Sequence, residues 1–334
     1  MIIKNNPDEF QNYLSDASNY HGSAEAVYLP ESEPEIIELV KQCNHDKKQI
    51  TIAGNGTGLT GARVPGGGIV ISMERLNNIV ELNDVEKYLR VQPGMILKDL
   101  QDYVETRKLF YPPDPTERNC FIGATAAANA SGARSFKYGP TRDYVTGMKM
   151  VLPSGETLSM TRGQIVAEAY HFSFSTDQGN PYNFSIPHMD MPGTKNVSGY
   201  YCKKDMDLID LFIGSEGTLG IITELKLRLL PVTDDIVSCV VFFDREEDAL
   251  NFIDEARALT RTGSAGHEIE ISARGLEFFN KSANNFLRPD YPAIPENTCA
   301  VWFEQELTHR DHAVTGAWLQ LIQKHHADAD KTWL

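Results

Sequence analysis

Apolar and polar residues repeat at helical spacing in a few stretches of the chain and at strand spacing in many others. The capping box Ser32-Glu33-Pro34-Glu35, followed by an apolar stripe, predicts a first helix. Similar stripes predict a helix over 95–107 and a short one in DLIDLFIG at 207–214. Alternating or short continuous apolar runs predict strands. These strands are expected at 49–54, 68–73, 77–82, 88–94 and 222–229, with a hairpin at 148–160.

A second pattern begins at PVTDD (231–235), which we interpret as the boundary between domains of residues 1–230 and 231–334. This pattern predicts the element order β-α-β-β-α-β, from which the last strand is missing. Its elements are expected as a strand at 236–243, a helix at 245–260, a strand at 267–272, a short helix at 273–281, a strand at 299–307 and a helix at 312–326. The stretch 163–204 has weak periodicity and is predicted to be a long loop or an insertion. The expected fold class is α+β.

The composition limits the classes of binding partner and the cellular compartment that we expect. With 31 Lys and Arg against 46 Asp and Glu, the net charge of −15 argues against nucleic acid or an anionic membrane as a partner. No apolar run approaches the roughly 18 residues of a membrane span, and the first residues lack the pattern of a signal peptide. The five cysteines are scattered, so they predict neither a disulfide framework nor a zinc or iron–sulfur site. A cytoplasmic protein is expected.

The glycine-rich stretch 54-GNGTGLTGARVPGGGIVIS-72 is the first candidate for chemistry. Its core has the spacing G-x-G-x-x-G, but Ala62-Arg63 replaces the Lys-Ser/Thr that a Walker loop needs after its last glycine. A Rossmann loop would open a helix here, whereas a new strand is expected soon after Gly61. Two interpretations remain at this point: a flexible hairpin loop, or a nest of main-chain N–H groups that binds an anion.

Three further segments follow this loop. They are 112-PPDPTERNCFIGATAAANASGARSFKYGPTRDYV-145, 195-KNVSGYY-201 and 214-GSEGTLGIITELKL-227. Together with the glycine loop they resemble the FAD-binding segments of the vanillyl-alcohol oxidase (PCMH-type) flavoprotein superfamily, over residues 25–230. They are most similar to its glycolate and D-lactate dehydrogenase branch, which includes D-2-hydroxyglutarate dehydrogenases. The resemblance implies a PCMH-type FAD-binding domain of two α/β subdomains, followed by a partial ferredoxin-like substrate or cap domain.

By this resemblance FAD is the expected cofactor. The glycine loop would wrap the pyrophosphate, 113–116 would line the flavin side, 123–132 would pass the flavin ring and ribityl chain, and 216–222 would meet the adenosine half. The small residues of 123–132 also suit tight helix packing, which is the alternative. FAD is expected to be non-covalent because Thr57 stands where some relatives link flavin through a histidine. The implied cofactor-binding residues are Gly54, Asn55, Gly56, Thr57, Gly58, Leu59, Thr60, Gly61, Pro113, Asp114, Pro115, Thr116, Gly123, Ala124, Ala127, Asn129, Ala130, Gly132, Glu216, Gly217, Gly220, Ile221 and Ile222.

Candidates for catalysis are fewer, and the base is not identified. Arg134 and Arg142 carry the planar guanidinium that suits a substrate carboxylate or the flavin. The alternative for Arg142 is a structural pairing, together with its neighbour Asp143. Tyr138 is a third candidate. His171 and His188 lie in the weakly patterned stretch and are interpreted as surface residues.

The activity implied by the resemblance is oxidation of a small D-2-hydroxy acid, such as D-lactate, glycolate or D-2-hydroxyglutarate. Hydride would leave C2 for the flavin while a base takes the hydroxyl proton. The electron acceptor is unknown. The sequence departs from these relatives because their longer substrate domain carries a His-rich, often metal-binding motif late in the chain. Here His325 and His326 are adjacent and do not share a helix face, so no metal site is expected.

This departure leaves two alternatives open. Either the sequence is part of a longer oxidoreductase, or it is a noncatalytic FAD-binding subunit that a partner subunit completes. A weaker alternative is a reductase similar to the UDP-N-acetylenolpyruvylglucosamine enzyme, with NADPH as the donor. In the first two cases the chain by itself is expected to bind FAD without oxidising a hydroxy acid at an enzymatic rate.

Overall fold

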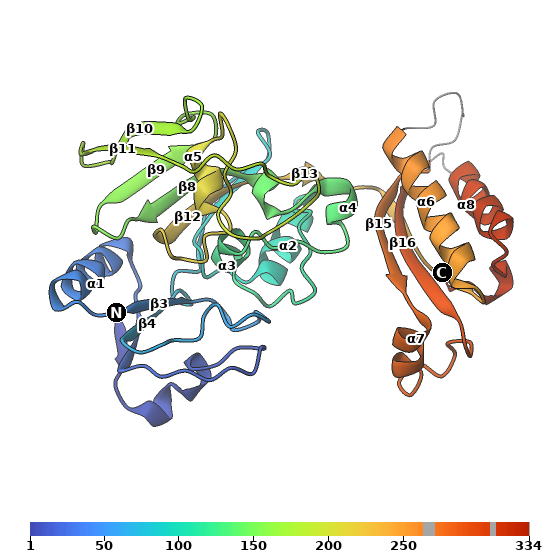
Figure 1. Ribbon diagram of the computed structural model, residues 1–334, viewed down its shortest axis with the longest axis horizontal. Helices are drawn as coiled ribbons and strands as arrows, with labels where there is room; N and C mark the ends of the chain where they lie inside the picture. The colour runs from blue at the N-terminus through green and yellow to red at the C-terminus, as the bar shows by residue number, and fades with distance from the viewer. Residues whose placement is uncertain (263–270, 308–311, 334) are drawn as a thin grey trace. The chain divides into compact units, whose positions relative to one another are not determined.

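A computed structural model of the 334-residue chain describes residues 1–262, 271–307 and 312–333 (Figure 1). Its contacts divide the chain into two compact units. Unit 1 comprises residues 1–131 and 140–231, and unit 2 comprises residues 132–139 and 232–334. The segment 132–139 therefore belongs to unit 2 by its contacts, although it lies within the sequence of unit 1. Both units mix helices and sheets, which confirms the expected α+β class.

The first sheet of unit 1 carries the glycine loop. Its strand order is β1 (Ile2–Lys4), β2 (Ala26–Leu29), β4 (Ile69–Ser72) and β3 (Ile50–Ala53). β2 and β3 run parallel to β4, and β1 is antiparallel to β2. Helix α1 (Glu33–Asp46) packs Ile36 and Val40 against Ile71 on one face of the sheet. Phe10 and Tyr13, from the N-terminal segment that holds η1 (Pro7–Glu9) and η2 (Gln11–Tyr13), pack on the other face.

The second sheet of unit 1 is antiparallel throughout. Its order is β5 (Ile79–Asn83), β6 (Tyr88–Val91), β12 (Ile221–Arg228), β8 (Val145–Val151) and β9 (Thr157–Thr161). The remaining elements of the unit are α2 (Leu97–Glu105), β7 (Leu109–Phe110) paired with β13 (Leu230–Pro231), α3 (Ile122–Ala127), η3 (Thr141–Tyr144), β10 (His171–Ser175) paired with β11 (Pro181–Ser185), and α5 (Leu208–Phe212). The β10–β11 hairpin lies beside β9, where Ser159 donates to Asp177 at 2.9 Å (Figure 1).

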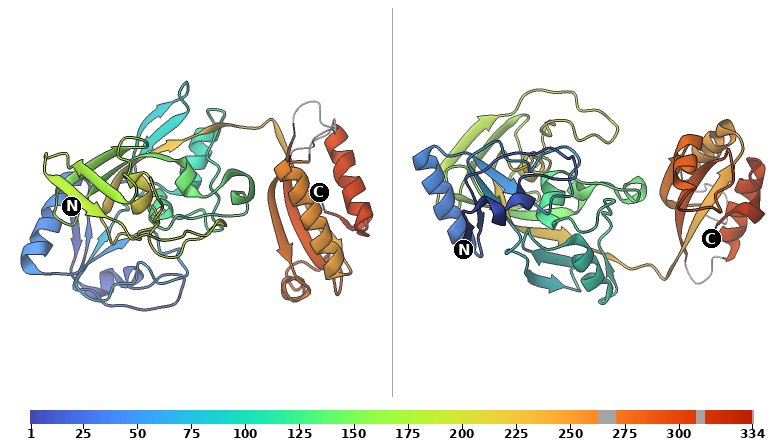
Figure 2. Two further views of the ribbon diagram at one scale, coloured as in Figure 1. Left: turned by 45° about the horizontal axis from the view of Figure 1, so that its top comes forward. Right: turned by 90° about the horizontal axis from the view of Figure 1, so that it is seen from below.

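Unit 2 is a three-stranded antiparallel sheet with two long helices on one face (Figure 2). The strand order is β14 (Asp235–Phe243), β16 (Cys299–Leu307) and β15 (Ala273–Phe279). Helices α6 (Glu246–Thr262) and α8 (His312–Lys324) bury Phe252 and Trp318 against Phe303 of the sheet. The unit also contains α4 (Ser135–Tyr138), α7 (Lys281–Leu287) and η4 (Ala329–Lys331). On the outer edge of β14, Trp333 and Val240 exchange two main-chain hydrogen bonds of 2.9 Å.

Most elements are confirmed where the hydrophobic pattern is long, and three expectations need correction. The capping box precedes α1 as predicted, but Ser32 makes no side-chain cap, and Glu35 accepts the N–H of Glu31 instead. The stretch 163–204 is not only loop, because it contains the β10–β11 hairpin. The short helix predicted at 273–281 is the strand β15, and the helix begins later, at Lys281, where Asn280 caps it.

The strand predicted at 267–272 lies largely outside the described residues, and its described part, 271–272, is not in a strand. All five cysteines are free and buried. Among the described helices, none combines the length and the apolar character that crossing a membrane would require.

Candidate cofactor site

The glycine loop connects two strands that both lie in the first sheet. It leaves β3 at Ala53 and reaches β4 at Ile69, and these described residues form no helix after the third glycine. The loop is therefore not a Rossmann turn. Gly56 and Gly61 have φ angles of 75° and 77°, in the left-handed region that residues with a Cβ rarely adopt. The backbone shape of the loop requires glycine at these two positions.

The main-chain N–H groups of the loop receive no acceptor from the protein. In the part of the chain that the structure describes, the N–H groups of residues 55–62 make no hydrogen bond, whereas the carbonyl oxygens of Gly54, Gly56 and Gly61 all accept one. N–H groups in this state need water or a ligand as partner. A run of them around left-handed glycines forms the kind of concave nest that binds anions.

Arg63 holds the loop against the N-terminal segment. Its Nε donates to the carbonyl of Ser15 at 3.0 Å and its Nη1 to that of Gly54 at 2.8 Å, while Nη2 donates to Ser15 and Asn12. A Cβ placed on Gly56 would lie 2.6 Å from the Arg63 Cζ, so the guanidinium fills the space that a side chain would need. No local pattern indicates this role, because the carbonyls come from a segment that is distant in the chain.

Helix α3 lies in the stretch of small residues described above. It packs against the base of the glycine loop. A Cβ on Gly54 would lie 2.8 Å from the Ala124 Cβ, and one on Gly123 would lie 2.4 Å from the Cβ of Pro93. The helix ends at Ala127, and the φ of 46° at Asn129, beyond the cap, allows the N–H of Ala130 to reach back to the carbonyl of Thr125. Small residues are therefore needed here for packing within the protein, in line with the alternative given above.

The predicted segment 214–227 contacts α3 and β3, and Asn119 of the predicted segment 112–145 contacts the glycine loop. The N–H groups of Gly214 and Glu216 donate to carbonyl oxygens at the end of α3, at 3.1 and 2.9 Å. A Cβ on Gly217 would lie 3.2 Å from the Ile52 Cγ1 of β3. Asn55 of the glycine loop donates to the carbonyl of Asn119 at 2.7 Å. Three segments that are separate in sequence, the glycine loop, residues 119–130 and residues 214–217, are thus adjacent in unit 1.

The remaining predicted cofactor residues of unit 1 differ in exposure. Leu59 is 76% exposed, and Gly58 and Thr60 beside it are exposed too. The segment 113–116 is positioned by Gln101, a buried residue that sequence reasoning missed, which donates to the carbonyls of Tyr111 and Pro113. Gly220 packs on β8, and the two residues that follow it, Ile221 and Ile222, are buried in β12, so they face the protein interior.

Arg142 is bound inside unit 1 by α5. Its Nη1 donates to the carboxylate of Asp210 at 3.0 Å, its Nη2 donates to the carbonyl of Ile213 at 2.7 Å, and its guanidinium lies 4.2 Å from the ring of Tyr201. The N–H of Arg142 donates to the side chain of Asn129, which ties this residue to the end of α3. Burial raises the pKa of the neighbouring Asp143. These contacts favour the structural role of Arg142.

Gly132, Arg134 and Tyr138 belong to unit 2. The Arg134 Nε lies 3.1 Å from Glu304, and the N–H of Gly132 donates to Ser135. Arg134 is part of a group of five charged side chains that we call the charged cluster. Its members are Arg134, Lys137, Arg274, Glu304 and Glu306. The guanidinium of Arg274 also lies 5.8 Å from the ring of Tyr138.

The histidines singled out in the sequence have protein partners. His171 is exposed on β10 and contacts Ser185, and His188 lies edge-on to Tyr170. The Nε2 of His325 is 2.8 Å from Glu255. Among the described residues there is no group of three or more His, Cys, Asp or Glu side chains placed to hold a metal ion.

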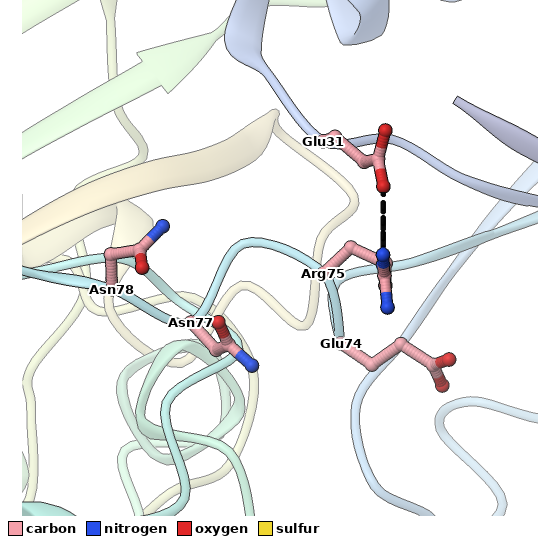
Figure 3. Close-up of a pocket in the computed structure, with 5 residues that line it drawn as sticks. All are labelled: Glu31, Glu74, Arg75, Asn77 and Asn78. Atoms are coloured by element: carbon pink, nitrogen blue, oxygen red, sulfur yellow. Dashed lines mark hydrogen bonds and ion pairs between the residues drawn. The ribbon is translucent and has the colours of Figure 1, made fainter.

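One pocket of unit 1 lies apart from the predicted residues (Figure 3). It is lined by Glu31, Glu74, Arg75, Asn77 and Asn78. Its charged groups already have partners: Arg75 donates to Glu31 at 2.9 Å, and Glu74 accepts the Tyr13 hydroxyl at 2.8 Å (the Arg75–Glu31 bond is drawn in Figure 3). The glycine loop and its neighbours are therefore the candidate cofactor site.

Comparison with known proteins shows what the chain is similar to. Residues 24–161 match the family described as FAD binding domain. The chain is 35% identical over 243 residues to a D-lactate dehydrogenase of Anaerostipes hadrus, covering 72% of this chain and 44% of the relative. It is 32% identical over 246 residues to the glycolate oxidase subunit GlcD of Bacillus subtilis, covering 73% and 45%. A D-2-hydroxyglutarate dehydrogenase of Stutzerimonas stutzeri is 27% identical over 332 residues, with 93% of this chain and 61% of the relative covered.

Among solved structures, an alkyldihydroxyacetonephosphate synthase has a similar fold, with a TM-score of 0.71 at 17% identity. The match covers 98% of this chain and 61% of that one. The chain spans less than half the length of the D-lactate dehydrogenase and of the glycolate oxidase subunit.

Proposed function

The chain carries an FAD binding domain of the PCMH type, in the branch of the D-lactate and glycolate dehydrogenases, and from this premise we propose that it is the flavin-binding part of an enzyme that oxidises a small D-2-hydroxy acid. The relatives named for this activity act on D-lactate, glycolate and D-2-hydroxyglutarate.

The observation that carries the proposal is the state of the glycine loop. Its N–H groups at 55–62 have no acceptor among the described residues, and left-handed glycines at 56 and 61 shape the main chain that carries them. These features fit the pyrophosphate of FAD, which needs donors but no base or metal from the loop. The cofactor is proposed to be non-covalent, because Thr57 offers no ring nitrogen for a link to the flavin.

The predicted segments of unit 1 would hold FAD between them. The glycine loop would bind the pyrophosphate, the start of α3 and the segment 113–116 would lie on the flavin side, and 216–217 would meet the adenosine half. When bound, FAD supplies the hydride acceptor for the oxidation. The protein has to orient the acid, bind its carboxylate and remove the hydroxyl proton.

A noncatalytic FAD-binding subunit is the second candidate, and two observations favour it. One of the relatives is itself named a subunit of glycolate oxidase. In addition, the guanidinium groups of Arg134 and Arg142 face Glu304 and Asp210, so both candidate carboxylate clamps are already paired with a protein carboxylate. A partner subunit would then supply the base and the clamp. A cytoplasmic location is part of either proposal.

The two candidates differ in what the complete gene product does. The gene is expressed to its stop codon, wherever that lies, the protein is loaded with FAD, and it is mixed without oxygen with D-lactate, L-lactate, glycolate and D-2-hydroxyglutarate. Loss of the flavin absorbance with a D-2-hydroxy acid or glycolate, but not with L-lactate, is the result expected of the enzyme. FAD binding without reduction by any of these acids would favour the subunit, and failure to bind FAD would contradict both candidates.

A further inference from the structure

The guanidinium of Arg63 is a cation beneath the glycine loop that the protein does not pair with a carboxylate. It is partly buried, and its hydrogen bonds go to main-chain carbonyls of Asn12, Ser15 and Gly54. Within the described residues no carboxylate oxygen lies within ion-pair distance of it, whereas Arg134, Arg142 and Arg162 each have such a partner. Arginine stays charged in proteins, so this positive charge needs another counter-charge.

The acidic groups that face Arg63 balance it only in part. Burial lowers the pKa of Arg63, and Asp16, Tyr13 and Glu74 oppose this. Burial, with help from Glu74, raises the pKa of the Tyr13 hydroxyl to about 12, so Tyr13 is neutral at pH 7. Glu74 accepts hydrogen bonds from Tyr13 and Ser72. Asp16 is the remaining anion, and its Oδ1 accepts the N–H of Ser18.

The guanidinium of Arg63 lies directly against the main chain of the loop. Its Cζ atom is 2.6 Å from the place where a Cβ of Gly56 would be. On that main chain, the N–H groups of residues 55–62 have no protein acceptor. A positive charge behind a row of free N–H groups raises the affinity of the row for an anion, because both act in the same direction at short range.

From this arrangement we propose that Arg63 is the counter-charge of the cofactor pyrophosphate, acting through the glycine loop without touching the phosphates. It is a positioning residue, and the inference rests on the proposed function because it assumes FAD as the ligand. It also explains how a chain with a net charge of −15 binds a dianionic group with no lysine or second arginine in the loop. The alternative is that Arg63 only braces the loop through its hydrogen bonds.

The test separates charge from bracing with two substitutions. Arg63→Gln removes the charge, and Arg63→Lys keeps the charge but loses most of the forked hydrogen bonds. Arg107→Gln, at an exposed arginine that contacts Tyr103, is the control for the change in net charge. The Kd for FAD is measured by flavin fluorescence at low and at high KCl, with riboflavin as the probe that lacks phosphates. Circular dichroism and thermal melting report whether each variant is folded.

We expect Arg63→Gln to weaken FAD binding by about 10- to 100-fold at low salt, with a smaller loss at high salt. Arg63→Lys should bind within about 5-fold of the wild type, and riboflavin affinity should be equal in all four proteins. Equal weakening by Arg63→Lys and Arg63→Gln, or an equal loss for riboflavin, would overturn the proposal in favour of a brace. If Arg63→Gln does not fold, Arg63→Lys and the salt dependence of the wild type still decide, because a salt-independent Kd for FAD would contradict a counter-charge. A wild type that binds no FAD at all refutes the proposed function instead.

Discussion

The glycine loop of unit 1 and the charged cluster of unit 2 use their polar groups in opposite ways. In the loop, donors at 55–62 are left without protein acceptors, and the cation behind them has only carbonyl partners. In the charged cluster, Arg134, Lys137 and Arg274 all face the carboxylates of Glu304 or Glu306. Both regions contain arginines that suit anion binding, but the arginines of the charged cluster have carboxylate partners, whereas Arg63 has none among the described residues.

We use this difference to distinguish a candidate ligand site from a structural cluster of ion pairs. Polar groups that the protein does not satisfy need water or a ligand, whereas charges that are paired and nearly buried mainly specify how segments dock. By this criterion we propose the glycine loop as the ligand site, while the ion pairs of the charged cluster connect the segment 132–139 to the sheet of unit 2. Substitutions that should affect one region and leave the other unchanged test this contrast between the two regions.

The largest effect is expected at Gly56. Gly56→Val forces a branched side chain into a φ of 75° and places its Cβ 2.6 Å from the Arg63 Cζ. We expect FAD affinity to fall by about 100-fold or more, and the free energy of unfolding by about 1–3 kcal/mol from backbone strain. Fluorescence titration with FAD and urea unfolding measure the two quantities. Gly163→Val is the matched control, because Gly163 has a φ of 86° with nothing within 4 Å of its Cβ position. An equal loss of FAD affinity in the control would mean that strain alone is responsible.

A loss of stability without a loss of binding is expected at Glu304. Glu304→Gln removes a carboxylate that pairs with the buried Arg274 and with Arg134, which we expect to destabilise unit 2 by about 2–4 kcal/mol. Trp302, Trp318 and Trp333 are all in unit 2, so tryptophan fluorescence during urea unfolding reports on this unit. Glu277→Gln, on the exposed side of β15, is the control and should change stability by less than about 0.5 kcal/mol.

The same Glu304→Gln protein should bind FAD within about 3-fold of the wild type. A large loss of FAD affinity would show that the charged cluster belongs to the cofactor site, and the contrast between the two regions would then be wrong.

The opposite result, a loss of binding without a loss of stability, is expected at Gly58. A Cβ at this exposed position would meet only the Asp16 Oδ2, at 3.7 Å, and its φ is not in the left-handed region. Gly58→Val should therefore fold normally but block the approach of the pyrophosphate to the main chain, weakening FAD binding by about 10- to 100-fold. Gly193→Val, where nothing lies within 4 Å, serves as control. Wild-type FAD affinity in Gly58→Val would refute the nest.

The sequence predicts those parts of the fold that depend on local pattern. The strands on either side of the loop follow from QITIAG and GIVISM, and the exclusion of a Rossmann helix follows from the short distance to β4. The sequence predicts a helix where β15 lies, because the short apolar run GLEFF fits both helical and strand spacing. Its register irregularity near Arg274, which breaks the alternation, is set by pairing with β16.

Features that depend on distant segments could not be predicted. The role of Arg63 arises only when residues 12–17 fold back onto the loop and present their carbonyls. Likewise, nothing local indicates that Arg134 belongs to unit 2, since its partner Glu304 is 170 residues away. The β10–β11 hairpin was missed because exposed polar residues interrupt its aromatic side chains, of which Phe172 is fully buried.

The central claim, that the glycine loop binds FAD without a covalent bond, is tested most directly by titration followed by acid precipitation. The purified 334-residue chain is incubated with FAD, its Kd is measured, and the complex is precipitated with acid. The account predicts saturable binding and yellow flavin in the supernatant, because Thr57 cannot form the histidine link. Colour retained in the washed pellet would contradict the non-covalent site, and no binding of added FAD by the folded chain would contradict the assignment of the loop itself.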